Sequence, residues 1–258
     1  MGQTEQLIAL IQALYDAVSV NISGIQRVAV AFSGGVDSSV LAKLCSLLKK
    51  EVTLVTIGFP GSPDINFSKS IASKLGMNHK TCEIDYFGFQ EKLQYVLRTI
   101  KCSNTSHIEN CIAYHYISKL AKQNGLDVVL SANGCDELFC GYDKYRKVYC
   151  DGEAKIQRLM EENLINEFAL MEEINLVAAQ LGIEVRQPFL SPEFIEFAKN
   201  IPINQKIKGP DDRIRKHILR RTAIALGVPK ESAMKPKKAL QYGSYIDKYF
   251  KKINKIML

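Results

Sequence analysis

Several features are missing from this chain of 258 residues, and each absence excludes a class of protein. There is no tryptophan, and no apolar run approaches the roughly 20 residues that a transmembrane helix needs. The first ten residues contain Glu5 and no basic residue, unlike a secretory signal peptide. Seven cysteines without a Cys-x-x-Cys pair argue against a disulfide framework or a zinc site. We therefore expect a soluble, cytoplasmic protein with reduced, mostly buried thiols and no membrane contact.

Charge is distributed unevenly along the chain. The net charge is +7, and the basic excess lies in the last fifty or so residues, after residue 205. Such a segment either contacts nucleic acid or balances a polyanionic nucleotide. Because no zinc finger and no basic motif interleaved with aromatic residues is present, nucleic acid is not expected as a partner.

Strand and helix patterns alternate through the first half of the chain, which predicts an α/β fold with a doubly wound parallel sheet. The expected strands cover 28–32, 52–57, 79–84 and 127–131, and the expected helices cover 7–18, 37–49, 62–75, 90–100 and 107–123. Later helical patterns cover 167–181, 192–200 and 213–226. We expect an α/β domain over 1–142 and a helical part over 143–258 that packs on the same domain and completes its site.

A glycine-rich loop follows the first expected strand. Its residues are Ser33, Gly34, Gly35, Val36, Asp37, Ser38 and Ser39. Two glycines let the backbone approach an anion, and free N–H groups converge at the start of the next helix, so the loop is suited to pyrophosphate. It is no Walker-type loop, because Asp37 stands where that loop carries lysine; an aspartate here is suited to Mg²⁺ shared with the phosphates. The alternative is that the loop is an ordinary turn between a strand and a helix, in which Asp37 caps the helix.

Four segments, taken together, resemble the synthetase domain of glutamine-dependent asparagine synthetases and of the related β-lactam synthetases. They span about residues 28 to 245. The segments are the loop 33–39, the stretch 57–64 (IGFPGSPD), the block 131–142 (SANGCDELFCGY), and GIEVRQPFL at 182–190 followed by KPKKA at 235–239. The resemblance implies the adenine nucleotide alpha hydrolase-like fold of N-type ATP pyrophosphatases. It also implies an enzyme that uses ATP and Mg²⁺ to adenylate a carboxylate, releases pyrophosphate, and passes the acyl group to ammonia or an amine.

The resemblance assigns roles to individual residues. Asp37 and Asp136 match magnesium ligands, although Asp136 could instead cap the helix that begins near Glu137. Lys237 matches the catalytic lysine that stabilises charge on the leaving pyrophosphate, and Asp136 and Glu137 belong to the same catalytic block. The alternative for Lys237 is a solvated surface lysine, since it lies in a lysine-rich stretch.

Four further positions match the family's nucleotide site. They are Phe32, Ile57, Ser131 and Ala132, which would hold adenine and ribose at the strand ends together with the loop. Phe32 and Ile57 equally suit the core of the protein. Arg186 falls on a family arginine, but its segment could serve mainly to lock the helical part onto the sheet.

The chain also departs from the family pattern. Asn133 replaces the family's glutamate, and an amide can neither accept a proton nor carry the charge that pairs with an ammonium. The stretch 102–110 lacks the arginine that asparagine synthetases carry in this region. Glu109 or His107 could supply the missing base, or each is an ordinary residue of a helix's first turn.

The family's N-terminal cysteine nucleophile does not appear in this sequence, which opens Met1-Gly2. We therefore expect a carboxylate substrate, with aspartate as the first choice, and ammonia, another amine or a separate glutaminase subunit as nitrogen source. A homodimer is the expected assembly. Two alternatives are a related ATP pyrophosphatase that acts on another carboxylate or a nucleoside, and a degraded nucleotide-binding subunit that partners a glutaminase.

Overall fold

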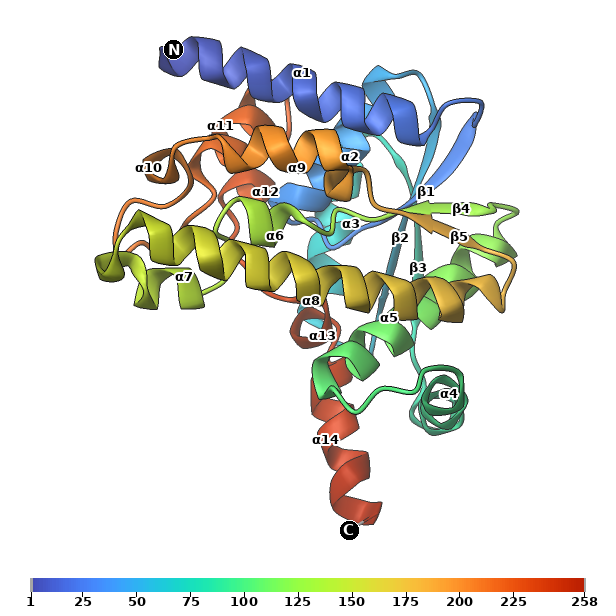
Figure 1. Ribbon diagram of the computed structural model, residues 1–258. Helices are drawn as coiled ribbons and strands as arrows, with labels where there is room; N and C mark the ends of the chain where they lie inside the picture. Colours follow the sequence, from blue (N-terminus) through green and yellow to red (C-terminus); the bar gives the residue numbers. More distant parts are fainter. Residues whose placement is uncertain (1, 258) are drawn as a thin grey trace.

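A five-stranded parallel sheet forms the centre of the computed structural model, which describes residues 2–257 (Figure 1). The strand order is β3-β2-β1-β4-β5. The strands are β1 (Arg27–Ala31), β2 (Glu51–Gly58), β3 (Asn78–Glu83), β4 (Val128–Leu130) and β5 (Glu184–Arg186). The chain reverses its direction of travel across the sheet between β1 and β4, where Val30 pairs with both Leu54 and Leu130. The predicted doubly wound parallel sheet is confirmed.

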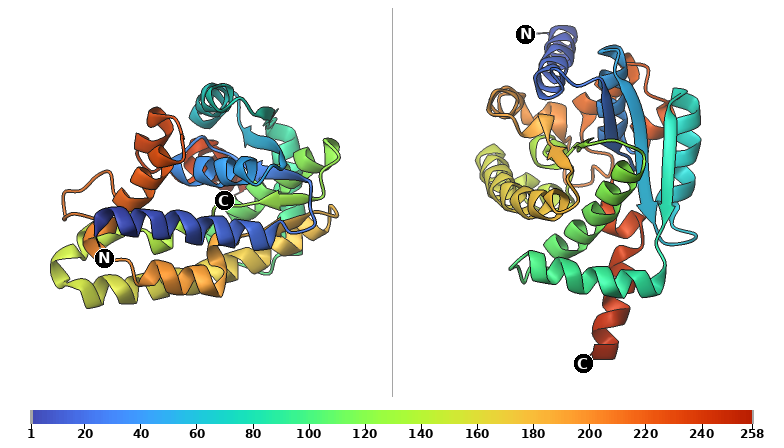
Figure 2. Two further views of the ribbon diagram at one scale, coloured as in Figure 1. Left: turned by 90° about the horizontal axis from the view of Figure 1, so that it is seen from above. Right: turned by 90° about the vertical axis from the view of Figure 1, so that its right-hand side faces the viewer.

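Helices cover both faces of the sheet (Figure 2). In the right-hand view, α3 lies on one side of the strands and α5 and α8 lie on the other. The long helices are α1 (Gln3–Asn21), α2 (Val36–Leu47), α3 (Pro63–Leu75), α4 (Tyr86–Thr99), α5 (Thr105–Gln123) and α8 (Glu153–Ala179). Because α5 packs along α8 and also on β2, β3 and β4, it connects the sheet to the second half of the chain.

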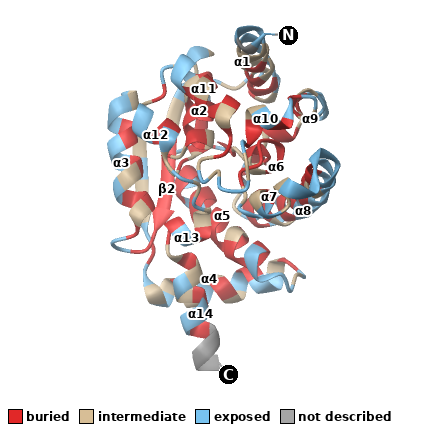
Figure 3. Cartoon of the chain, turned by 90° about the vertical axis from the view of Figure 1, so that its left-hand side faces the viewer, coloured by how far each residue is buried: buried red, intermediate tan, exposed pale blue. Residues whose placement is uncertain are grey.

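The remaining helices lie in the second half of the chain. They are α6 (Cys135–Leu138), α7 (Lys144–Lys147), η1 (Tyr149–Asp151), η2 (Pro188–Leu190), α9 (Pro192–Lys199), α10 (Ile203–Lys206), α11 (His217–Ala225), α12 (Lys230–Met234), α13 (Leu240–Gly243) and α14 (Ile246–Met257). Buried residues run continuously from the sheet into these helices (Figure 3). No described helix is long and apolar enough to cross a membrane.

Local sequence signals explain several helix ends. Pro63 occupies the first turn of α3 after Ser62, and Gly76 ends this helix with φ of +66°, as the sequence predicts. Asn104 begins α5 by accepting hydrogen bonds from the backbone N–H groups of Ser106 and His107. The side chain that caps α5 thereby fixes where His107 lies.

The second half of the chain differs from its predicted helical pattern in three places. β5 was expected to lie within a helical region, but its three residues pair with β4 and extend the sheet. The helix expected over 213–226 covers only His217–Ala225, because Arg215 and Lys216 adopt positive φ values of 52°. The helix expected from Glu167 begins earlier, at Glu153. A strand of three residues is too short to show the alternation of apolar and polar residues by which a strand is recognised in a sequence.

All seven cysteines are free thiols. Cys45, Cys111, Cys135 and Cys140 are buried, Cys82 and Cys102 are half-buried, and Cys150 is exposed. Burial raises the pKa of the Cys45 thiol to about 12, which suits an inert core residue.

Candidate functional site

A cavity opens at the carboxyl ends of β1, β2 and β4, beside the point where the chain reverses its direction of travel across the sheet. This is where ligands bind in doubly wound sheets. The predicted residues that line it are Phe32, Ser33, Asp37, Ser38, Ile57, Ser131, Ala132, Asp136, Glu137 and Lys237. A smaller cavity adjoins it, and both share Ser33, Asp37, Lys237 and Lys238. Residues far apart in the sequence are thus brought to one place.

The loop after β1 has a backbone that only glycine permits. Gly34 has φ of +72°, and a Cβ there would lie 2.9 Å from the ring of Phe67. The Ser33 hydroxyl accepts a hydrogen bond from the N–H of Gly35 at 3.3 Å. Gly35 then begins α2 without a side chain to cap it, so N–H groups at the start of this helix stay available to an anion.

Two predicted loop residues do not line either cavity. Gly34 permits the turn of the loop and packs against Phe67. Ser39 is fully buried, and its hydroxyl accepts a hydrogen bond from Ser232 on α12 at 2.8 Å. Ser39 therefore joins α2 to α12 and does not face the cavity.

A buried ammonium connects the two predicted magnesium ligands. Lys216 Nζ lies 2.6 Å from Asp37 Oδ2 and 2.7 Å from Asp136 Oδ1, and its side chain is 1% exposed. Asp136 also bonds to Lys237. Burial alone would raise the pKa of Asp136, but Lys216 and Lys237 outweigh burial and lower it. The capping alternative for Asp136 is wrong, because Gly134 begins α6 and no side chain caps it.

Gly141 makes room for this network. A Cβ at Gly141 would overlap Lys216 Cε and Asp136 Oδ1. Arg215 donates from Nε to the carbonyl of Gly141 at 3.0 Å, which holds the segment before α11 against the loop after α6. The positive φ of Lys216 follows from this packing, since the residue must turn inward between two carboxylates.

The residues present suit a magnesium ion beside this network. Asp37 Oδ1 is buried and has no hydrogen-bond partner within the described part of the chain. A buried carboxylate oxygen without a partner is costly, and a hard cation would satisfy it. Asp37 and Asp136 both contact the Lys216 ammonium, so their carboxylates lie close enough to act on one group of phosphates.

The smaller cavity is strongly basic. It is lined by the loop residues Ser33 and Gly35 and by Lys216, Arg220, Lys235, Lys237 and Lys238. Lys235 donates to the carbonyl of Ser33 at 3.3 Å, pairs with Asp64 at 3.3 Å and lies over the Phe67 ring at 3.9 Å. A pocket with several cations and backbone donors is suited to an anion of high charge density.

Arg220 stabilises the segment that supplies these lysines. Its guanidinium donates to the carbonyls of Ile214, Arg215, Ala233 and Lys235, at 2.6 to 3.0 Å. Three residues of the basic stretch noted in the sequence, Arg215, Lys216 and Arg220, are therefore buried and bond to carbonyls or carboxylates of other segments.

The far end of the larger cavity contains two buried carboxyl groups. Tyr142 donates to Glu137 Oε1 at 2.5 Å. Asn133 Nδ2 donates to Glu167 on α8, and Asn133 Oδ1 accepts from Tyr114 at 2.9 Å. Burial raises the pKa of Glu137 to about 8, and the charges of Glu167 and Asp136 add to the effect. Burial likewise raises the pKa of Glu167.

The raised pKa of Glu137 predicts a stability that falls with pH. The group keeps its proton to about pH 8 in the folded protein but loses it near pH 4.5 in the unfolded chain. Its contribution to the free energy of unfolding is therefore fully present below pH 4.5 and decreases as the pH rises to about 8. Each pH unit in this window contributes about 1.4 kcal/mol at most. We expect Glu137→Gln to flatten this slope and to be more stable than the wild type at pH 8. Urea unfolding at pH 5 and pH 8 without nucleotide measures the difference; equal slopes in the two proteins would contradict the assignment.

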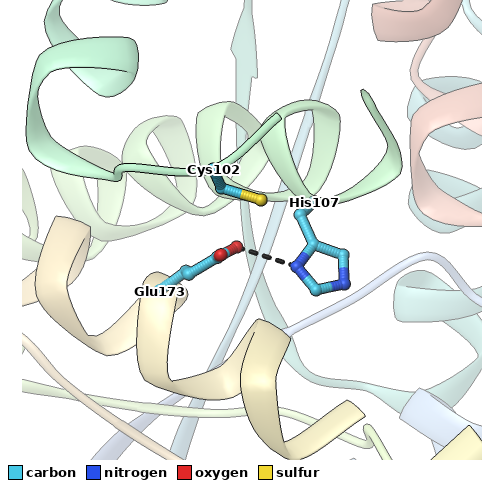
Figure 4. A group of neighbouring side chains, drawn as sticks. All are labelled: Cys102, His107 and Glu173. Atoms are coloured by element: carbon cyan, nitrogen blue, oxygen red, sulfur yellow. Dashed lines mark hydrogen bonds and ion pairs between the residues drawn. The ribbon is translucent and has the colours of Figure 1, made fainter. Parts of the chain in front are cut away.

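The two candidates for a missing base lie in different surroundings. Glu109 does not line the cavity; burial raises its pKa to about 7, and Asp247 on α14 adds to this. His107 lines the cavity wall, but both its nitrogens are engaged, Nδ1 with Glu173 at 2.9 Å (Figure 4) and Nε2 with Asn166 at 3.2 Å. Arg186 lies outside the cavity, where it pairs with Glu184 and donates to the carbonyl of Asn21.

Sequence reasoning missed three residues of the site. Lys216 lay in a basic stretch assigned to a helix, Lys235 was noted only as part of a motif, and Glu167 was placed at the start of a helix. Nothing in their local spacing marks them. The replacement of the family's glutamate by Asn133 is a stronger signal. The loss of one carboxylate from the family block suggests that another residue supplies a carboxylate nearby.

Comparisons with known proteins agree with this geometry. The family model "Asparagine synthase" matches residues 9–173 and 151–257. "Putative asparagine synthetase (glutamine-hydrolyzing) 1" of Methanocaldococcus jannaschii is 31% identical over 95% of this chain and 50% of that protein. Asparagine synthetase B (glutamine-hydrolyzing) of Escherichia coli K12 is 27% identical over 81% of this chain and 40% of that protein.

A solved structure described as NMN synthetase from Francisella tularensis overlaps 98% of this chain and 87% of that chain, with a TM-score of 0.49 and 15% identity. That overlap is too loose to carry an argument about function. The chain spans about half the length, or less, of the curated relatives described above. On the family model and the identity across nearly its whole length, the chain belongs to the asparagine synthase family.

Proposed function

We propose that this chain is an ATP-dependent, AMP-forming amide synthetase that adenylates a carboxylate and transfers the acyl group to ammonia or an amine. The observation that carries the proposal is the buried network in which Lys216 joins Asp37 to Asp136 while Lys237 contacts Asp136 at the cavity. A protein that only bound a nucleotide would not need to hold these charges against the cost of desolvation. The network therefore favours an enzyme over a degraded subunit.

In the proposed complex, the adenosine part of ATP lies along the strand ends. Phe32 and Ile57 offer apolar surface, and Ser131 and Ala132 bring polar backbone groups. The phosphates extend to the loop Ser33–Ser38 and into the smaller basic cavity. Asp37 and Asp136 would hold Mg²⁺, which when bound neutralises charge on the phosphates.

Lys237 has the position required for the adenylation step. It bridges the two cavities, and its ammonium already contacts Asp136. As the acceptor carboxylate attacks the α-phosphorus, the bond to the bridging oxygen breaks and pyrophosphate leaves. The Lys237 and Lys235 ammonium groups would stabilise the negative charge that moves toward the smaller cavity.

Glu167 is our candidate for the base of the second step. Its carboxylate accepts from Asn133, the residue that replaces the family glutamate, so a carboxyl group from α8 reaches the same end of the cavity. A raised pKa brings this group closer to neutral pH, where a general base is most effective. An ammonium would give a proton to Glu167, and the ammonia formed would attack the acyl carbon and displace AMP.

This role predicts a separation of the two steps. We expect Glu167→Gln to lower amide formation by about 10²-fold or more, while pyrophosphate exchange into ATP changes by less than about tenfold. The reason is that adenylation needs no proton acceptor at the amine. The matched control is Glu172→Gln, because Glu172 is exposed on the same helix and lines neither cavity. An equal loss of both steps in Glu167→Gln would assign it a structural role instead.

Aspartate is the proposed acceptor, and ammonia is the proposed amine. The described cavity lining includes no arginine, so a second carboxylate of the acceptor would depend on Lys238, while Glu167 could pair with an amino group. A separate glutaminase subunit and a homodimer stay predictions. Aspartate-dependent exchange of labelled pyrophosphate into ATP tests the acceptor directly. If another carboxylate supports exchange and aspartate does not, aspartate is excluded while adenylation stands.

A further inference from the structure

A second cluster of reactive side chains lies behind the cavity wall. Cys102 comes from the segment between α4 and α5, His107 from the first turn of α5, and Glu173 from α8 (Figure 4). One ligand atom from each lies within 4.8 Å of the others. Because 66 residues separate His107 from Glu173 in the sequence, no motif spacing could reveal the group.

Hydrogen bonds around His107 leave a place for a cation. Nε2 lies 3.2 Å from Asn166 Oδ1 and can donate a hydrogen bond to it. With that nitrogen as the donor, the lone pair of Nδ1 faces the Glu173 carboxylate 2.9 Å away. This arrangement has room for a cation, either a proton or a metal ion, between the two groups.

The geometry does not suit a nucleophilic triad. In such a triad the nitrogen opposite the carboxylate contacts the sulfur. Here that nitrogen, Nε2, contacts Asn166. It points away from Cys102, as Figure 4 shows. Cys102 Sγ instead lies on the same side of the ring as Glu173 and accepts from the N–H of Asn104 at 3.3 Å.

We propose that Cys102, His107 and Glu173 bind one zinc ion through Sγ, Nδ1 and a carboxylate oxygen. A thiolate, an imidazole and a carboxylate favour Zn²⁺ over Mg²⁺. The thiol proton leaves to solvent, so Zn²⁺, thiolate and carboxylate sum to zero charge in a largely buried place. The ligand atoms need to move only by about 1 Å to reach the roughly 3.5 Å separations of a tetrahedral zinc site.

Two further features fit this assignment. Asn166 holds the outer nitrogen of His107, which is the contact that orients a metal-binding imidazole. The fourth position is open to water, because Cys102 is half-buried and Glu173 is 20% exposed. The ion would link the segment between α4 and α5, which contains Cys102, to α8. This link lies beside the part of the cavity wall that His107 and Asn166 form.

The test is titration of the chelator-treated full chain with Co²⁺, followed by competition with Zn²⁺. We expect one equivalent of Co²⁺ with a thiolate-to-cobalt band in the near ultraviolet, displaced by Zn²⁺. Cys102→Ser should remove the band, and Asn166→Ala should weaken binding by about tenfold. Cys150→Ser is the control, because this thiol is exposed and outside the cluster. Absence of a thiolate band, or an unchanged band in Cys102→Ser, would overturn the proposal.

A second measurement needs no variant and therefore does not depend on folding. Zn²⁺ should slow alkylation of Cys102 by iodoacetamide at least about tenfold, measured on peptides by mass spectrometry, while Cys150 reacts at an unchanged rate. Equal alkylation of Cys102 with and without Zn²⁺ would mean that His107 and Glu173 form an ion pair only.

Discussion

Lys216→Met is expected to lower the free energy of unfolding by about 3–5 kcal/mol and to abolish pyrophosphate release from ATP. The substitution removes the ammonium that lies 2.6 Å from Asp37 and 2.7 Å from Asp136, and leaves two carboxylates facing each other in a buried place. The pKa of Lys216 is raised because the attraction of Asp136 and Asp37 exceeds the opposing effect of burial, so the charged form is the stable one. Urea unfolding at pH 7 measures the loss.

Lys206→Met is the matched control for this effect. Lys206 is as deeply buried as Lys216, but its ammonium has no carboxylate partner within the described residues and donates to the carbonyl of Ala198 at 2.6 Å. Burial lowers the pKa of Lys206 to about 8. Its replacement should cost about 1 kcal/mol or less and leave activity intact. Equal losses in the two variants would show that buried volume matters and that the ion network does not.

Lys237→Ala is expected to lower pyrophosphate release by about 10²–10³-fold while changing the free energy of unfolding by less than about 1 kcal/mol. Stability is retained because Asp136 keeps Lys216 as its partner. The rate falls because Lys237 supplies an ammonium where charge develops between the two cavities. Single-turnover release of pyrophosphate at saturating Mg-ATP separates this effect from weaker binding.

Lys230→Ala controls for the loss of a positive charge from the same segment, since Lys230 is exposed on α12 and lines neither cavity. Its activity should stay within about twofold of the wild type. A Lys237→Ala protein with normal release would show that the lysine is a surface residue, the alternative that its lysine-rich surroundings allow.

The chain pattern predicts the part of the fold that local rules control. β1 and β2 are apolar runs, α3 has a proline start and a glycine end, and the loop after β1 needs the positive φ of Gly34. These features depend on residues within one turn of each other. Their positions also place the site, because the carboxyl ends of neighbouring parallel strands meet at one edge.

Long-range contacts account for what the pattern did not predict. β5 is stable as a strand only because β4 offers it a partner. Lys216 turns inward because Asp37, 179 positions earlier, and Asp136 attract it. Glu167 reaches the cavity because α8 packs on α5. In each case the decisive interaction joins residues that are distant in the sequence, so no local period or spacing contains it.

The basic character of the second half also has a structural explanation. Lys206, Arg215, Lys216 and Arg220 are buried and donate to carbonyls or carboxylates within the protein. The smaller cavity is lined by Lys216, Arg220, Lys235, Lys237 and Lys238. Of the two interpretations that the sequence left open, these positions favour a balance for a polyanionic ligand.

The central claim is that the chain couples cleavage of ATP to formation of an amide. The most direct measurement is the release of AMP and pyrophosphate from Mg-ATP with aspartate and ammonium, alongside other carboxylates, with asparagine followed by mass spectrometry and Lys237→Ala as control. The account predicts equal amounts of AMP, pyrophosphate and asparagine, dependent on aspartate and lost in the variant. ATP that binds at the site while no carboxylate elicits pyrophosphate would contradict it.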